Sequence, residues 1–321
     1  MSSAANLPEV AHVPPLVAVV GATGTGKTGC AVRLAQRLEA QGLSAEIVNA
    51  DAMQLYRGMD IGTAKATEGE RGGIEHHLLD VWEVSREASV ADYQAMARAK
   101  IVELQARGTI PILVGGSGLY VSSVLYEFEF PGTDPALRDE LEKRLASEGR
   151  EALVRELATH DPLAAVAIDS RNSRRLIRAL EVVTLTGKPF GAGLDAERRR
   201  WQDGVVIIGL HTDRELLVER LDQRVEQMWK DGLVDEARGL IAHGLREGVT
   251  ASRAIGYQQA LAVIDGESSD AEAQESTQAL TRRYARRQGS WFRRDESITW
   301  FDSDDAALID SASALVAGER P

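Results

Sequence analysis

The residues best suited to chemistry lie in GATGTGKT, at positions 21–28. This stretch matches the phosphate-loop pattern G-x-x-x-x-G-K-[ST], with an apolar run before it and helical spacing after it. Its glycines allow the backbone to wrap an anion and to present amide groups at a helix N-terminus. The pattern therefore predicts a diphosphate site formed by Gly21, Ala22, Thr23, Gly24, Thr25, Gly26, Lys27 and Thr28, with the Thr28 hydroxyl as a ligand for Mg²⁺.

The residues that would accompany this loop in a nucleotide hydrolase are missing from the expected place. Such enzymes usually carry a second acidic residue at the end of a neighbouring strand, where it helps to hold the metal. The strand-like run 109–116 is followed instead by Ser117 and Gly118, and no acidic residue occurs before Glu127. Asp80 is a possible substitute, in a stretch that is only weakly strand-like. The sequence thus predicts a diphosphate site without the usual hydrolytic residues.

Asp51 is the acidic residue that we expect nearest to the phosphate loop. It follows the apolar run 45–50, at the carboxyl edge of a predicted strand, where open α/β sheets bind their ligands. A carboxylate in that place can hold a metal or act as a general base. A role in a turn or as a helix N-cap explains the same spacing equally well. From the residues alone, both interpretations of Asp51 stay open.

The elements that must position these residues alternate between strand-like and helix-like patterns. Helical spacing over 27–38 and 91–108 separates runs that predict strands at 16–20, 45–50, 109–116 and 205–210. This alternation predicts an α/β fold, with a parallel sheet flanked by helices as in P-loop NTPases.

A different pattern covers residues 131–200, which contain helical periodicity but no strand-like run. We expect a helical insertion domain there, between two parts of the core domain at 15–130 and 201–321. The chain after residue 212 is expected to be mostly helical, and residues 1–14 are expected to form a loose N-terminal tail.

Composition restricts the class of protein. The chain has 321 residues, 44% of them hydrophobic, and no apolar run approaches the ~20 residues that a membrane-spanning helix needs. The first residues lack the basic and apolar regions of a signal peptide, and Cys30 is the single cysteine. These features predict a cytoplasmic protein with no membrane partner and no obligate protein partner.

Two arginine clusters qualify the acidic net charge of −12, which by itself argues against a nucleic-acid partner. Arg171, Arg174, Arg175 and Arg178 would form one stripe on a helix, and Asp169 and Glu181 are the acids that could neutralise it. We favour contact with RNA phosphates. The second cluster, TRRYARRQGSWFRR at 281–294, contains six arginines and three aromatic residues. Base stacking and anchoring in the core explain its aromatic residues equally well.

Six stretches, in this order, resemble the bacterial tRNA dimethylallyltransferases, also called tRNA isopentenyltransferases or the IPP transferase family. They are GATGTGKT, NADAMQLYRGMDIGTAK, GGSGLY, RRLIRALEV, RAIGYQQA and TRRYARRQGSWFRR. The resemblance implies transfer of a dimethylallyl group from dimethylallyl diphosphate to the exocyclic amine of the adenosine 3′ of the anticodon in tRNA. It also implies Mg²⁺ as cofactor and a monomeric protein.

The resemblance implies roles for individual residues. Asp51 matches the general base that takes a proton from the adenine amine. Lys27 and Thr28, together with Mg²⁺, would stabilise the departing diphosphate. Ser117 stands where the family usually has Thr, and it keeps the hydroxyl that would contact the leaving group. Arg224 matches an arginine expected near the diphosphate.

The resemblance also implies a tRNA-binding surface, with the target base flipped out of its stacked loop to reach Asp51. The family more often has Gln where Arg174 stands. The residues implied in tRNA binding are Asp51, Ala52, Met53, Gln54, Ser117, Arg138, Arg174, Arg175, Leu176, Ile177, Arg178, Arg253, Ala254, Ile255, Gly256, Tyr257 and Gln258.

Two other functions share parts of these patterns. A small-molecule or nucleotide kinase would have the same sheet and phosphate loop, but it would bind ATP and need a lid that supplies arginines. A non-catalytic RNA-binding protein with a degenerate nucleotide site is the second alternative. Lys27, Thr28 and Asp51 together argue against degeneration.

Overall fold

The structure is a computed structural model, and it describes residues 13–128, 130–169, 172–190 and 199–319. The chain divides into two compact units. Unit 1 comprises Met1–Leu125 and Gln202–Pro321, and unit 2 comprises Tyr126–Trp201. The predicted insertion at 131–200 lies within unit 2, which begins slightly earlier, at Tyr126.

Unit 1 is built on a sheet whose described strands run parallel in the order β3-β2-β4-β1-β5-β6. The strands are β1 (Leu16–Gly21), β2 (Ala45–Asn49), β3 (His76–His77), β4 (Ile110–Gly115), β5 (Val205–His211) and β6 (Thr299–Asp302). The predicted α/β fold with a parallel sheet is confirmed. Val20 pairs with Gly115, so the phosphate loop after β1 and the segment after β4 leave the sheet side by side.

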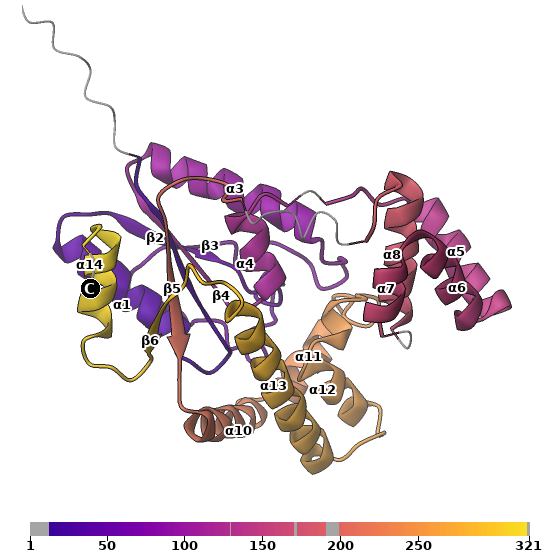
Figure 1. The fold of residues 1–321 in the computed structure, drawn as a ribbon. Coiled ribbons are helices and arrows are strands. Elements are labelled where there is room, and N and C mark those ends of the chain that lie inside the picture. The colour runs from indigo at the N-terminus through magenta and orange to yellow at the C-terminus, as the bar shows by residue number, and fades with distance from the viewer. Residues whose placement is uncertain (1–12, 129, 170–171, 191–198, 320–321) are drawn as a thin grey trace, which may run out of the picture. The chain divides into compact units, whose positions relative to one another are not determined.

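Helices cover this sheet because its central strands are apolar on both faces. The helices of unit 1 are α1 (Lys27–Ala40), α2 (Glu68–Arg71), α3 (Val90–Ala106), α4 (Gly118–Leu125), α10 (Arg214–Lys230), α11 (Leu233–Ile241), η1 (Ala251–Arg253), α12 (Tyr257–Ile264), α13 (Asp270–Phe292) and α14 (Leu308–Val316). On one face, Leu34 of α1 and Ala312 of α14 share a buried core with Val19 and Ile112. Figure 1 shows α14 beside α1 on that face.

Unit 2 is a helical cluster made of α5 (Pro135–Glu148), α6 (Arg150–His160), α7 (Pro162–Ala167) and α8 (Ser173–Thr186). Leu141, Leu153, Leu157 and Leu180 form its buried core. Asp134 and Asp161 cap the N-termini of α5 and α7, each directly before a proline in the first helical turn.

None of the described helices combines the length and the apolar character that crossing a membrane would take.

Candidate active site

The phosphate loop joins β1 to α1 and is shaped by its own backbone. Gly26 caps α1 with φ of 75°, a left-handed conformation that favours glycine, and no side chain caps the helix there. The first amides of α1 have no acceptor within the helix and are available to an anion. Thr25 Oγ1 and Lys27 Nζ both donate to the Ala22 carbonyl, at 2.9 and 2.7 Å, and so hold the loop closed.

A cavity of about 420 Å³ lies against this loop. Its walls include Lys27, Thr28, Asp51, Gln54 and Arg224, so the structure brings together most residues that the sequence placed near the diphosphate. Ser117 is not in the cavity wall, although its neighbour Gly116 is.

Two partly buried cations give the cavity its electrostatic character. Burial lowers the pKa of Lys27 to about 8; the Asp51 carboxylate opposes this change, and the Arg224 guanidinium adds to it. Burial also lowers the pKa of Arg224, while Asp51 and Glu70 act in the opposite direction. Arg224 comes from α10 and donates to Thr23 Oγ1 and to the Thr63 carbonyl, both at 3.4 Å. The site thus holds two partly desolvated positive charges, which suits a polyanionic ligand.

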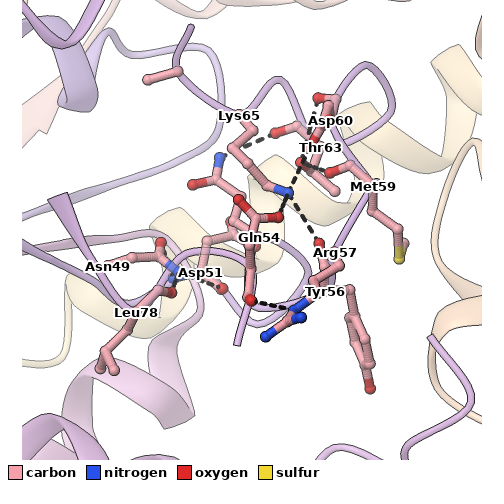
Figure 2. A network of polar contacts seen from close by, with 12 residues as sticks. Asn49, Asp51, Gln54, Tyr56, Arg57, Met59, Asp60, Thr63, Lys65 and Leu78 are labelled. Atoms are coloured by element: carbon pink, nitrogen blue, oxygen red, sulfur yellow. Dashed lines mark hydrogen bonds and ion pairs between the residues drawn. The ribbon is translucent and has the colours of Figure 1, made fainter. Parts of the chain in front are cut away.

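Asp51 is held in a turn and faces the cavity at the same time. Its Oδ1 accepts a hydrogen bond from the Met53 amide at 2.9 Å, and its own amide donates to Asn49 Oδ1 at 2.9 Å. Asn49 Nδ2 donates to the carbonyls of Asp51 and Leu78 at 3.1 and 3.0 Å, as Figure 2 shows for this corner of the site. The turn interpretation of Asp51 is therefore confirmed, and it is compatible with a carboxylate that lines the cavity.

Ser117 follows β4 and lies next to the Asp51 segment. Its Oγ accepts a weak hydrogen bond from the Ala52 amide at 3.4 Å and is 3.3 Å from the Tyr284 hydroxyl. The side chain is almost completely buried. Ser117 thus connects the segment after β2 with α13.

The loop after Asp51 is fixed by a buried lysine. Lys65 Nζ contacts Asp60 Oδ1 at 2.6 Å and donates to the Tyr56 carbonyl at 2.9 Å (Figure 2). It also contacts Asp80 Oδ1, at 2.6 Å. Gln54 Nε2 donates to the Thr63 carbonyl at 3.2 Å, so part of its amide already serves the loop. Asp80, which the sequence offered as a substitute metal ligand, is paired with Lys65 and does not line the cavity.

Glu236 of α11 anchors the same loop, and no motif in the sequence predicts this role. Its carboxylate accepts hydrogen bonds from the amides of Asp60, Ile61 and Gly62, at 3.1, 2.8 and 3.3 Å. The hydroxyl of Tyr257 donates to the same carboxylate at 2.6 Å. Three amides and a phenol therefore converge on one acidic side chain.

The segment 253–258 is arranged differently from the helical pattern that we expected. Gly256 is the N-cap of α12, with φ of 92°, rather than a residue inside a helix. The side chain of Tyr257 is fully buried against Glu236, whereas Arg253 and Gln258 are exposed. The tRNA contact of this segment stays a prediction, and its exposed side chains are Arg253 and Gln258.

In unit 2, the residues of α8 that the resemblance implies in tRNA binding differ in exposure. Arg174 and Arg175 are exposed on α8, whereas Leu176 and Ile177 are buried in the core. Arg171 lies outside the described residues. The tRNA contact of the stripe stays a prediction.

Arg178 is part of an internal ion pair. Arg178 and Arg138 both contact the fully buried carboxylate of Glu181, at 2.6 and 3.3 Å. Burial raises the pKa of Glu181, but hydrogen bonds from Arg178, the Asp134 amide and Arg138 outweigh it, and the pKa is lowered overall. Glu181 therefore neutralises the charges of Arg178 and Arg138.

The second arginine cluster lies on α13, and its aromatic residues face inward. Phe292 is buried, and Trp291 Nε1 donates to Ser122 Oγ at 3.1 Å. These contacts support anchoring in the core over base stacking. The exposed arginines on this part of the chain are Arg283, Arg286, Arg287, Arg293 and Arg294.

Comparison with known proteins identifies the family. The IPP transferase family matches residues 54–295. A tRNA dimethylallyltransferase of Clavibacter sepedonicus is 55% identical over 307 residues, which are 96% of this chain and 99% of that protein. The crystal structure of a tRNA isopentenylpyrophosphate transferase from Bacillus halodurans aligns with a TM-score of 0.68 and 41% identity, over 95% of this chain and 96% of that one.

A more distant structure, a eukaryotic dimethylallyltransferase acting on tRNA, shares the fold with a TM-score of 0.78 at 24% identity, over 96% of this chain and 80% of that one. The family predicted from the six sequence stretches is thus confirmed. The chain belongs to the IPP transferase family and is an enzyme of that family.

Proposed function

We propose that this enzyme transfers a dimethylallyl group from dimethylallyl diphosphate to the N6 amine of the adenosine 3′ of the anticodon in tRNA. The observation that carries the proposal is one cavity lined by the phosphate loop, by Lys27 and Arg224, and by the Asp51 carboxylate. Groups suited to bind an anion and a carboxylate suited to act as a general base thus line the same cavity. The names of the relatives, which contain tRNA and a dimethylallyl or isopentenyl group, support these substrates.

The donor binds through its charge. The first amides of α1 and the ammonium of Lys27 would hold the diphosphate oxygens, and Arg224 would reach them from α10. During transfer the bond between the dimethylallyl carbon and the diphosphate oxygen breaks, and its electron pair stays on that oxygen. Positive charges fixed beforehand stabilise the negative charge that develops there.

Asp51 acts on the acceptor. The exocyclic amine of adenine is a poor nucleophile because its lone pair is delocalised into the ring. As the new bond between N6 and carbon forms, the amine proton passes to the Asp51 carboxylate. The products are N6-(dimethylallyl)adenosine, diphosphate and a protonated carboxyl that returns its proton to water.

The adenosine would reach Asp51 only after leaving the stack of the anticodon loop. Gln54 lies in the cavity wall, and an amide can pair with the edge of an adenine. The exposed arginines of α13, and Arg174 and Arg175 of unit 2, supply positive charge for RNA phosphates on a chain that is acidic overall.

The residues of the cavity fit a Mg²⁺ ion that is held by one protein ligand together with the diphosphate. Within the described ranges, no three His, Cys, Asp or Glu side chains come together as a metal site. Mg²⁺ commonly keeps several waters and binds through one or two protein groups plus substrate phosphates. Thr28 in the cavity wall would be the protein ligand, and the ion, when bound with the diphosphate, neutralises part of its charge.

The test is mass spectrometry of an unmodified anticodon stem-loop RNA after incubation with the protein, dimethylallyl diphosphate and Mg²⁺. We expect the RNA to gain one dimethylallyl group on the adenosine 3′ of the anticodon. A parallel reaction with ATP and no prenyl donor tests for phosphoryl transfer. An unmodified RNA, or a phosphorylated product with ATP, would refute the proposal.

A further inference from the structure

Gln288 of α13 joins the phosphate loop to the segment after β4. Its Oε1 accepts a hydrogen bond from the Thr23 amide at 2.8 Å, and its Nε2 donates to the Gly116 carbonyl at 2.8 Å. The side chain is only 4% exposed. Both ends of one buried amide are therefore engaged by backbone groups from the two segments that follow β1 and β4.

The neighbours of Gln288 on α13 contact the same region. Tyr284 and Trp291 lie one turn to either side on the same face of the helix, and they contact Ser117 and Ser122. The approach is close, because a Cβ at Gly116 would lie 2.5 Å from Gln288 Nε2. A Cβ at Gly118 would lie 2.4 Å from the Trp291 ring. The helix is packed against this segment with no room for a side chain between them.

We propose that Gln288 is a positioning residue for diphosphate binding, acting through the phosphate loop. It turns the Thr23 amide toward α13, so that the backbone path from Thr23 to Gly26 is set before the ligand arrives. Arg224 of α10 donates to the Thr23 side chain. Thr23 is thus fixed by two helices, through its amide and through its hydroxyl. This inference rests on the proposed diphosphate site.

A purely structural role of Gln288 would predict that its replacement lowers stability and leaves diphosphate binding unchanged. Loss of the Gln288 amide leaves the Thr23 amide and the Gly116 carbonyl without their buried partner, and such groups move to find another one. The groups that move belong to the anion-binding loop and to the strand end before Ser117. The main consequence should therefore be weaker diphosphate binding, in addition to any loss of stability.

The experiment measures binding of inorganic diphosphate with Mg²⁺ by calorimetry, which needs no transfer reaction. The variants are Gln288→Met, which removes both hydrogen bonds, and Gln288→Glu, which keeps an acceptor for Thr23 but loses the donor to Gly116. Gln278→Met is the matched control, because Gln278 on the same helix donates to the Asp222 carbonyl at 3.3 Å and neither residue lines the cavity. Thermal unfolding without ligand measures the structural effect of each change.

We expect Gln288→Met to raise the Kd for diphosphate at least about tenfold and the KM for dimethylallyl diphosphate in parallel. The Kd for tRNA should be unchanged, and Gln278→Met should bind diphosphate as the wild type does. Gln288→Glu should be weaker than the wild type as well, since its charge opposes the anion. If the wild type and both Gln288 variants bind diphosphate equally, Gln288 has no positioning role. If the wild type itself fails to bind diphosphate, the proposed function fails first.

Discussion

Asn49 holds Asp51 through both polar groups of the Asp51 backbone. Asn49 Oδ1 accepts from the Asp51 amide at 2.9 Å, and Asn49 Nδ2 donates to the Asp51 carbonyl at 3.1 Å. Asn49 is the last residue of β2 and is itself buried. The sheet therefore fixes the direction in which the Asp51 carboxylate points, and little reorganisation is left for the reaction.

Replacing Asp51 by asparagine should remove the base and keep the turn, because an amide oxygen can still accept from the Met53 amide. We expect kcat for dimethylallyl transfer to fall at least about 100-fold, with the Kd for tRNA unchanged. Steady-state kinetics and a filter-binding assay measure the two quantities. Asp139→Asn, at an exposed ion pair of unit 2, is the control. Wild-type turnover by Asp51→Asn would exclude Asp51 as the base.

The pKa of Lys27 predicts a pH dependence of diphosphate binding. In the free protein this pKa is lowered to about 8, chiefly by burial. Lys27 therefore loses its charge as the pH rises through this value, and we expect the affinity for diphosphate to decrease above it, by up to about tenfold per pH unit. Calorimetry between about pH 7 and about pH 9 measures the effect. Lys27→Arg should lack this decrease, since a guanidinium stays charged throughout. An affinity of the wild type that is constant over this range would contradict the assignment.

The same burial predicts that the charged Lys27 side chain lowers the free energy of unfolding. Its folded pKa of about 8 lies below the ordinary value of 10.5, so below about pH 8 both states carry the proton and the full cost applies. Between these two pH values the unfolded state binds more protons than the folded state, so the stability of the wild type increases as the pH rises. At neutral pH we expect Lys27→Met to unfold at a temperature a few degrees higher than the wild type when no ligand is present, with a difference that shrinks at alkaline pH. Thermal unfolding at several pH values measures this. A Lys27→Met protein less stable than the wild type at neutral pH would overturn the prediction.

Arg175 and Arg178 should give different results although they belong to one predicted stripe. Arg175 is exposed, so Arg175→Ala should weaken tRNA binding and reduce the slope of log K against log salt by about 1. Arg178 shares the buried carboxylate of Glu181 with Arg138. Arg178→Met should therefore destabilise the protein, by about 2 kcal/mol, because part of the compensation for a buried charge is lost.

The two arginines are compared by salt titration of tRNA binding and by thermal unfolding. Adding Glu181→Gln to Arg178→Met should recover part of the lost stability, since the buried charge is then gone. An unchanged salt slope for Arg175→Ala would remove Arg175 from the RNA interface.

The central part of the fold was predictable because its elements carry strong local patterns. The four apolar runs became β1, β2, β4 and β5, and the first predicted helix became α1 (Lys27–Ala40). The two edge strands were not predicted. His76–His77 is too short for a pattern, and Thr299–Asp302 is only partly buried, so neither shows the apolar run of a central strand.

The candidate site was predictable where a residue lies in a local motif, as Lys27 and Asp51 do. The residues that support them were not, because their partners are far away in the sequence. Glu236 binds amides that precede it by more than 170 positions, and a single glutamate on a helix gives no sign of that. The aromatic residues of 281–294 fitted two interpretations because burial depends on the whole fold, and only the folded structure distinguishes them.

The link between Thr23 and Gln288, which are 265 positions apart, has a consequence for biosynthesis. GATGTGKT is translated before the glutamine that contacts its backbone. A nascent chain that has been made only as far as α12 therefore carries the complete phosphate-loop sequence without this contact. The Thr23 amide gains its buried partner only when α13 has been made and has docked.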